Sequence, residues 1–305
     1  MARFIIIRIF QALVTLIVIS MVVFALARAS GDPVMLMAPA QASLADIQAL
    51  REYLGLDKSL PEQYWVFLKN VVKGDFGESI RTRRPVSTIL LERVPYTIQL
   101  GLSAIAIGLC TSLVLGVTAA YRRGTWVDST VKFIAICGQA LPSFWLAIMA
   151  IQIFAVVLGW LPTSGTGGPT HYILPILTMS FFMLPMMTRL MRSSMLEVLD
   201  SEYIKMARIK GLPEAKVVWK HAFRNAIITL LTAAGITFAT IITGAVIIET
   251  VFAWPGLGRL IAQAVMERDF PVTQAVVLLV AIVVLAVNLV VDILYAYVDP
   301  RIRYD

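Results

Sequence analysis

The sequence is poor in the residues that build disulfides and metal sites. Among its 305 residues are only two cysteines and two histidines. Two cysteines exclude a disulfide-rich scaffold and a zinc site made of cysteine thiolates, and two histidines leave little for a histidine-based metal site or proton relay. The Gly-Lys pair of a P-loop is also absent. The chain therefore has no motif of this kind for binding ATP.

Charged residues are scarce as well. They make up 15% of the chain, whereas hydrophobic residues make up 59%. A soluble domain has about 25% charged and about 45–50% apolar residues. This composition excludes a disordered chain, and it strongly disfavours a soluble enzyme. It is typical of a polytopic, all-α membrane protein.

Long apolar runs hold most of the hydrophobic residues. A membrane-spanning helix needs about 20 mostly apolar residues. Six stretches of the chain meet this requirement, at residues 9–27, 96–120, 133–158, 172–190, 226–248 and 272–296. The alternating pattern of an outer-membrane barrel is absent. The sequence predicts six transmembrane helices, and it predicts that Pro142, Pro175 and Pro185 kink or break their helices.

The positions of Lys and Arg predict how these helices are oriented. Short cytoplasmic loops carry an excess of both residues. With a cytoplasmic N-terminus, the inner segments hold fifteen of them, and the short outer segments hold only Arg259 and Arg268. Both termini are therefore expected in the cytoplasm. The first apolar run has 19 residues, more than the roughly 7–15 of a signal peptide, so we expect a retained helix.

The predicted spans divide the chain into three parts. Residues 1–27 form the N-terminal tail and first helix, 28–95 form an extracytoplasmic segment, and 96–305 form a five-helix core. Within the extracytoplasmic segment, Ser43 suits the N-cap of a helix. Gly55 suits its end, because glycine readily adopts the left-handed conformation found there.

A second extracytoplasmic helix is expected to begin at Pro61 and to end at Gly74. Trp65, Leu68 and Val72 share one of its faces. One interpretation is a small helical cap packed on the membrane domain, and the other is a docking platform for an outer partner. Because apolar stripes usually form part of a core, the cap is favoured.

The cytoplasmic loop at residues 191–225 predicts two short helices. Ser201 is a good N-cap for the first, Gly211 supplies its left-handed end, and Pro213 suits the start of the second. Ala207 and Gly211 lie four residues apart and lack bulky side chains. We therefore expect them to present a bare surface that another molecule can approach closely.

Three interpretations of this basic loop compete. A DNA-reading helix-turn-helix rarely lies between two membrane helices. A basic helix can also lie on anionic lipid, and it can insert into a cytoplasmic protein partner. The residues themselves favour the last two equally.

Polar groups within the spans are few. A charged side chain at the centre of the bilayer costs about 2.5–3.5 kcal/mol on insertion scales. The polar groups within the spans include Gln139, Glu249, Asn288 and Asp292. For the two carboxylates, an interfacial anchor or interhelical hydrogen bond is as well supported as a place in a transport path.

Several motifs resemble those of a known family. Residues 202–212, EYIKMARIKGL, and residues 220–226, KHAFRNA, resemble the EAA loop of ABC importer permeases, most closely the branch for dipeptides, oligopeptides and nickel. Other matching motifs follow in the right order along nearly the whole chain. They are GDP at 31–33, GLD at 55–57, GDFG at 74–77, ETVFAWPGLGR at 249–259, RDFP at 268–271, NLVVD at 288–292 and DPRIR at 299–303.

The match to the loop motif has three departures. Lys205 stands where the general motif has glutamate, and Met206 stands where it has its first alanine. The peptide branch commonly departs at these positions. The proline that this branch usually has shortly after Asn225 is also missing, so a less sharp entry into the fifth span is expected.

The resemblance implies a type I ABC importer permease fold, with the loop acting as a coupling helix in a groove of a separate ATPase subunit. Energy then enters through that partner, in agreement with the missing P-loop. The residues implied in coupling are Glu202, Tyr203, Ala207, Arg208, Lys210, Gly211 and Leu212. The candidates for a translocation path or gate are Gln139, Glu249, Trp254, Asn288 and Asp292.

The resemblance also implies a set of partners. These are a homologous second permease, two ABC ATPase subunits carrying ATP and magnesium, an extracytoplasmic binding protein and the bilayer, with no nucleic acid. No catalytic residue, metal or cofactor is expected on this chain itself. The expected location is the bacterial inner membrane.

The function that follows is import of dipeptides, oligopeptides or glutathione-like peptides. The same branch also carries nickel chelates and some sugars, but no nickel site is evident here. A rival hypothesis is an ion-coupled secondary transporter driven through Glu249 or Asp292, although no inverted repeat supports it. A membrane enzyme is disfavoured because no nucleophile and base occur together at membrane depth.

Overall fold

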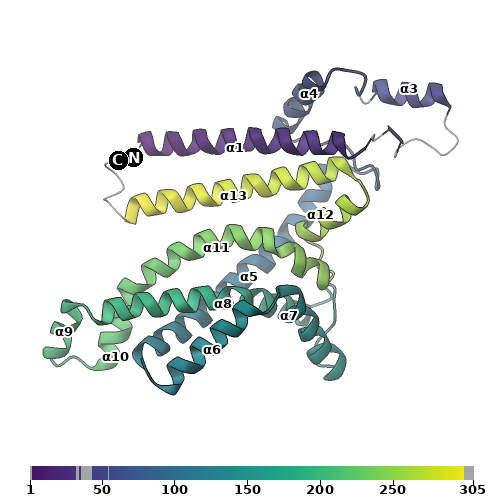
Figure 1. Cartoon of the computed structure of the whole chain (residues 1–305). Helices are drawn as coiled ribbons and strands as arrows, with labels where there is room; N and C mark the ends of the chain where they lie inside the picture. Colours follow the sequence, from purple (N-terminus) through teal and green to yellow (C-terminus); the bar gives the residue numbers. More distant parts are fainter. Residues whose placement is uncertain (1, 32–33, 36–42, 54, 299–305) are drawn as a thin grey trace.

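The computed structural model describes residues 2–31, 34–35, 43–53 and 55–298. The motif residues Asp32, Pro33 and 299–303 lie outside these ranges. Within the described ranges every named element is helical, and the long helices lie roughly side by side with both termini at one end (Figure 1). The long helices are α1 (Ala2–Ala29), α5 (Val86–Tyr121), α8 (Thr170–Leu199), α11 (Phe223–Val251) and α13 (Phe270–Val298).

Shorter helices lie between the long ones. Between α1 and α5 lie α3 (Leu44–Tyr53) and α4 (Leu60–Val72), and between α5 and α8 lie α6 (Trp126–Ala140), α7 (Ser143–Ala150) and η1 (Ile151–Val157). Between α8 and α11 lie α9 (Glu202–Ile209), α10 (Glu214–Lys216) and η2 (Val217–Ala222). Between α11 and α13 lies α12 (Leu257–Met266). Figure 1 places α9 and α10 at the end where the termini lie, and α3 and α12 toward the opposite end.

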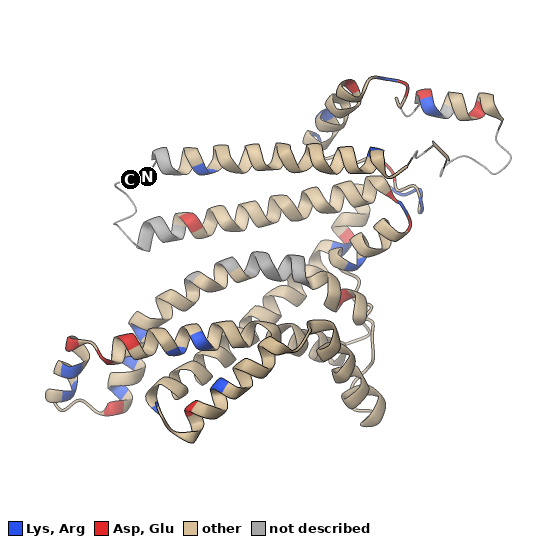
Figure 2. Cartoon of the chain, in the orientation of Figure 1, with Lys and Arg blue, Asp and Glu red and all other residues tan. Residues whose placement is uncertain are grey.

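Four helices of the described chain are long and apolar enough to cross a membrane: α1, α5, α8 and α13. A bent pair, α6 with α7 and η1, brings the number to five if it forms one span. In Figure 2 most charged residues lie toward the ends of the long helices and in the segments between them. The protein is thus an all-helical, polytopic membrane protein. The remaining predicted span, 226–248, lies within the 29-residue helix α11.

The third predicted span is not one straight helix. The stretch 133–158 was predicted as a single span, kinked or broken at Pro142. Helix α6 ends at Ala140 and α7 starts at Ser143 after a bend of 103°. Leu141 is extended there and Pro142 is the N-cap of α7, because proline disfavours the helical conformation in the residue before it. The predicted break is confirmed at Pro142. Pro175 and Pro185, by contrast, lie inside an unbroken α8.

The second span also begins earlier than hydropathy indicates. Helix α5 starts at Val86, ten residues before the predicted start at Tyr96, and it contains Pro95. Its first turns carry Glu92 and Arg93. These charges lowered the local hydropathy without ending the helix, so α5 extends out of the predicted apolar stretch.

The predicted ends of the helices in the segment 28–95 are confirmed. The amide of Asp46 donates to the hydroxyl of Ser43, and that hydroxyl donates in turn to the Asp46 carboxylate, which caps the start of α3. The backbone is left-handed at Gly55, with φ +64°, and at Gly74, with φ +78°. Both glycines therefore lie where the chain leaves a helix.

The buried face of α4 is not the predicted one. Tyr64 and Phe67 pack against Phe24 of α1, with ring centroids 5.5 and 5.6 Å apart, whereas Trp65 and Val72 are exposed. The predicted stripe was wrong because aromatic rings on the neighbouring face make the contact. Helix α4 is therefore held to α1 and leaves a second apolar face uncovered.

A row of methionines forms the centre of the core. Met183, Met187, Met191 and Met195 recur every four residues along α8, and all four are buried. Methionine adapts to irregular gaps between helices. Helix α5 approaches α8 closely, because a Cβ added at Gly116 would lie only 2.6 Å from Cβ of Met191. This packing fixes the helix from which the loop containing α9 extends.

Candidate functional site

Helix α9 projects from the end of α8 at the end of the molecule that carries both termini (Figure 1). Ser201 occupies its N-cap with extended backbone, as predicted, but the hydroxyl donates to the carbonyl of Val198 instead of capping α9. Glu202 lies in the first turn and accepts a hydrogen bond from Lys205 Nζ at 2.7 Å. A negative charge at this position also suits the positive end of the helix dipole.

The predicted turn at Gly211 is confirmed. Lys210 is the C-cap of α9, and Gly211 follows with φ +74°. The second predicted helix is not separate, because α10 continues through the π-helical η2 directly into α11. A turn and a continuous helical run therefore connect α9 to α11.

Two contacts tie α9 to that run. Arg208 donates from Nη2 to Glu214 Oε1 at 2.8 Å and from Nε to Oε2 at 3.3 Å, across the turn. The hydrogen bond with Glu214 raises the pKa of Arg208. Near the other end of α9, Asn225 Nδ2 donates to the hydroxyl of Tyr203 at 2.8 Å. We call the Arg208–Glu214 pair the turn clamp.

The inner face of α9 packs on its own chain. Ile204 and Ala207 are buried in the main core together with Val217 and Val218. The prediction of a bare surface was therefore wrong for Ala207, whose small side chain lets α9 lie close to η2. It holds for Gly211, which is exposed and has open space around it.

The outer face of α9 carries an exposed apolar row. Tyr203, Met206 and Ile209 are 46%, 53% and 79% exposed, and their spacing of three residues places them on one side of the helix. Exposed Lys210 continues this side, whereas Leu212 is half-buried behind the turn. An apolar row on a short, well-anchored helix is suited to insertion into a groove of another protein.

Glu249, a candidate for the path, lies in a buried polar corner. Its carboxylate is fully buried, accepts from Thr97 Oγ1 at 2.6 Å and accepts from the Arg259 amide at 3.0 Å. The Leu257 amide donates to Thr97 Oγ1 at 2.8 Å. Glu249 thus caps the start of α12 from α11, where the helix dipole favours a negative charge. These contacts are hydrogen bonds between helices.

Close packing holds this corner together. A Cβ at Gly256 would lie 2.2 Å from the Glu249 carboxylate, so only glycine fits there. Trp254 is fully buried, its indole N–H donates to the carbonyl of Tyr96 at 3.1 Å, and its ring meets that of Tyr172 at 4.6 Å. The corner therefore joins α5, α8, α11 and α12 into one unit.

The other three path candidates lie elsewhere. Gln139 is exposed on α6, beside the bend before α7. Asn288 and Asp292 are one turn apart on α13, where Asn288 is exposed and Asp292 is paired with Nε of Arg8 at 3.2 Å. The structure brings Glu249 and Trp254 together in the polar corner. Within this chain, the other three candidates lie apart from that corner.

Sequence reasoning missed a second buried carboxylate. Asp269 accepts from the hydroxyl of Ser79 at 2.5 Å and from the amides of Ile80 and Arg81 at 3.2 and 3.4 Å. It joins residues 79–81, before α5, to the start of α13. The RDFP motif at 268–271 drew attention to this position, but its partners lie nearly 190 residues away along the chain.

Comparison with family models covers almost the whole chain. Residues 112–304 match the binding-protein-dependent transport system inner membrane component, and residues 1–101 match the N-terminal part of a membrane component of such systems. A protein of Brucella abortus (strain 2308) with the provisional name peptide transport system permease protein is 41% identical over 98% of both chains. The glutathione transport system permease protein GsiC of Escherichia coli (strain K12) is 40% identical over the full length of both.

Solved structures share the fold. A permease chain in an inward-facing structure of the MetNI methionine ABC transporter superposes with a TM-score of 0.59 at 22% identity, covering 69% of this chain and 96% of that one. Membrane components of this kind operate with a binding protein and an ATPase. The chain belongs to the family of inner membrane components of binding-protein-dependent transport systems.

Proposed function

We propose that this chain is the translocation subunit of an ATP-driven importer for dipeptides, oligopeptides or glutathione-like peptides. The full-length similarity to relatives named for peptide and glutathione transport supports this substrate class. Nickel chelates and sugars are the alternative cargoes of the same machinery.

The proposed topology has six spans with both termini in the cytoplasm. It counts the bent α6–η1 segment as one span and adds α11 to the four long helices. The excess of Lys and Arg on the inner side supports it. So does the position of α9, which lies at the same end of the molecule as the termini (Figure 1).

The observation that carries the coupling proposal is the exposed row on α9. Met206 and Ile209 are exposed, and Tyr203 is 46% exposed although its hydroxyl accepts a hydrogen bond from Asn225. That bond and the turn clamp hold the helix in place. In the proposed mechanism this row inserts into an ATPase subunit. Closure of the ATPase pair moves α9, and the run from α10 to α11 carries the movement into the membrane.

The proposed path lies between this chain and a homologous second permease. Exposed Gln139 and Asn288 are suited to line it. The corner around Glu249 and Trp254 is suited to support a gate at the outer side, because it locks α12 to three other helices. An extracytoplasmic binding protein delivers the peptide to that side.

The coupling proposal is tested by placing a charge in the exposed row. Met206→Asp is expected to lower both recovery of the ATPase with the tagged permease and uptake of a labelled dipeptide by at least tenfold. Met266→Asp is the matched control, because Met266 is an exposed methionine near the opposite end of the molecule. Undiminished ATPase recovery with Met206→Asp would contradict the assignment of α9.

A further inference from the structure

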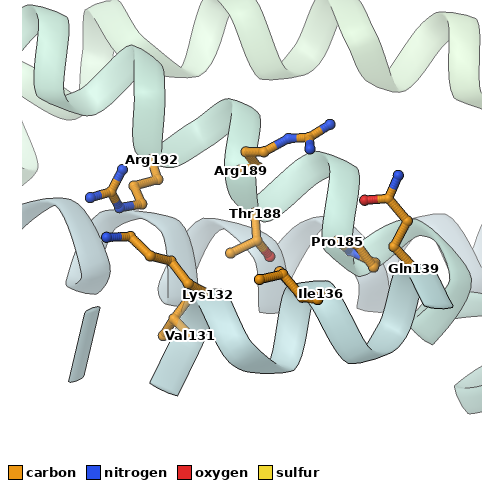
Figure 3. A pocket seen from close by; sticks show the side chains of 9 residues that line it. Val131, Lys132, Ile136, Gln139, Pro185, Thr188, Arg189 and Arg192 are labelled. Carbon is orange, nitrogen blue, oxygen red and sulfur yellow. The ribbon is translucent and has the colours of Figure 1, made fainter. Parts of the chain in front are cut away.

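A groove lies between α6 and α8, away from the polar corner and from α9. Its volume is about 320 Å³. Val131, Ala135, Ile136 and Pro185 form apolar walls, and polar residues border them. Figure 3 shows Lys132 and Arg192 near one end of the groove and Gln139 at the other.

Basic residues outnumber acidic ones around the groove. Asp128 is buried and accepts from Arg192 Nε at 2.7 Å and Nη2 at 3.0 Å, and it pairs with Lys132 Nζ at 2.9 Å. One carboxylate thus meets two cations. Arg189 also lines the groove, and no ion pair links it to another described residue. The groove therefore has an excess of positive charge.

One polar group inside the groove lacks a partner. Thr188 is 3% exposed, and no group of the described chain forms a hydrogen bond with its hydroxyl. Figure 3 shows its side chain extending from α8 toward α6. A buried hydroxyl without a partner costs about 1–3 kcal/mol. An acceptor supplied by a ligand would remove that cost.

The groove lies at a defined depth in the proposed topology. Arg189 follows the start of α8 at Thr170 by 19 residues, a rise of about 28 Å along the helix. The hydrocarbon core is about 30 Å thick. Because α8 runs inward, Arg189 lies near the cytoplasmic boundary of the core, where phospholipid headgroups begin.

We propose that this groove binds an anionic phospholipid of the cytoplasmic leaflet. The phosphate pairs with Arg189 and accepts the hydrogen of the Thr188 hydroxyl, and an acyl chain lies along Ile136 and Pro185. Basic pockets between membrane helices on the cytoplasmic side bind such headgroups. The charge excess selects an anionic lipid over a neutral one. The proposal depends on the topology above but not on the transported substrate.

The test measures which lipid stays bound. The full chain, with any subunits that remain attached, is placed in phosphatidylcholine nanodiscs containing dioleoyl phosphatidylglycerol, and retained lipid is counted by native mass spectrometry. Arg189→Gln is expected to lower retained phosphatidylglycerol about fivefold, the effect of one basic side chain near an anionic lipid. Thr188→Val is expected to lower it as well. Arg122→Gln, an exposed basic residue beyond the end of α5, is the matched control.

Three results would overturn the proposal. In the first, the Arg189→Gln variant retains as much phosphatidylglycerol as the unaltered chain, or as much as the Arg122→Gln control. In the second, inorganic phosphate displaces the lipid, which identifies a site for free anions. In the third, a cysteine at Ile136 forms cross-links with a second permease subunit, which identifies a subunit contact. None of these experiments measures uptake. A failure of the lipid proposal can therefore be distinguished from a failure of the proposed function.

Discussion

At the scale of single residues, Glu249 shows how a buried charge in a membrane helix can be structural. Its carboxylate joins α11 to the start of α12 and meets Thr97 of α5. Every contact that it makes holds helices together. This is why we assign it to the support of a gate and not to a surface touched by substrate.

Glu249→Ala is expected to destabilise the protein. Removing the carboxylate leaves the hydroxyl of Thr97 and the amide of Arg259 with fewer partners in a buried place, at a cost of about 1–3 kcal/mol. The thermal unfolding midpoint of the purified protein in detergent measures this, with Thr97→Val expected to lower it less. An unchanged midpoint together with lost uptake would instead place Glu249 in the path.

Gly211 offers a second prediction at this scale. Gly211→Arg is expected to abolish dipeptide uptake, because it adds a bulky side chain beside α9. Gly124→Arg is the control, because Gly124 has φ +76°, close to the +74° of Gly211, and equally open space around it. Both changes carry a similar backbone strain of about 1–2 kcal/mol. Uptake that survives in Gly211→Arg, or that is lost equally in both, contradicts a special role for this turn.

At the scale of elements, the turn clamp joins α9 to α10. Both partners are partly exposed, and such pairs contribute about 0–1 kcal/mol to stability. Arg208→Glu is therefore expected to leave the unfolding midpoint almost unchanged while lowering uptake. Adding Glu214→Arg reverses the pair and is expected to restore part of the uptake. If the double variant is no better than the single one, the clamp does not transmit movement.

Local signals predicted much of this structure. Hydropathy located the long helices, and the conformational freedom of glycine predicted the turns at Gly55, Gly74 and Gly211. Proline was a poorer guide, because Pro142 breaks a helix while Pro175 and Pro185 do not. A break depends on whether packing against neighbouring helices supports the continuous form, and a local pattern does not contain that information.

The candidate site was predicted less completely, because its contacts join distant parts of the chain. The Thr97–Glu249 hydrogen bond spans 152 residues and the Ser79–Asp269 bond spans 190. The sequence located the loop around α9 but not which of its faces is exposed. That face depends on the packing of Ala207 and Ile204 against η2, which no local periodicity revealed in so short a helix.

At the scale of the whole molecule, the two ends have different structural roles. One end holds α9 with its exposed apolar row. The other holds the polar corner and helices α3 and α4 (Figure 1). In the proposed topology the first end is cytoplasmic and binds an ATPase, and the second is extracytoplasmic and receives a binding protein.

Cross-linking from α9 tests that claim most directly. In a chain with Cys110 and Cys137 replaced by serine, a single cysteine at Ile209 is treated with a short bifunctional reagent in native membranes, and the products are identified by mass spectrometry. A cysteine at Met266 is the control for the opposite end. The account predicts a P-loop ATPase joined to position 209 and absent from position 266. An ATPase joined to position 266, or none at position 209, would contradict it.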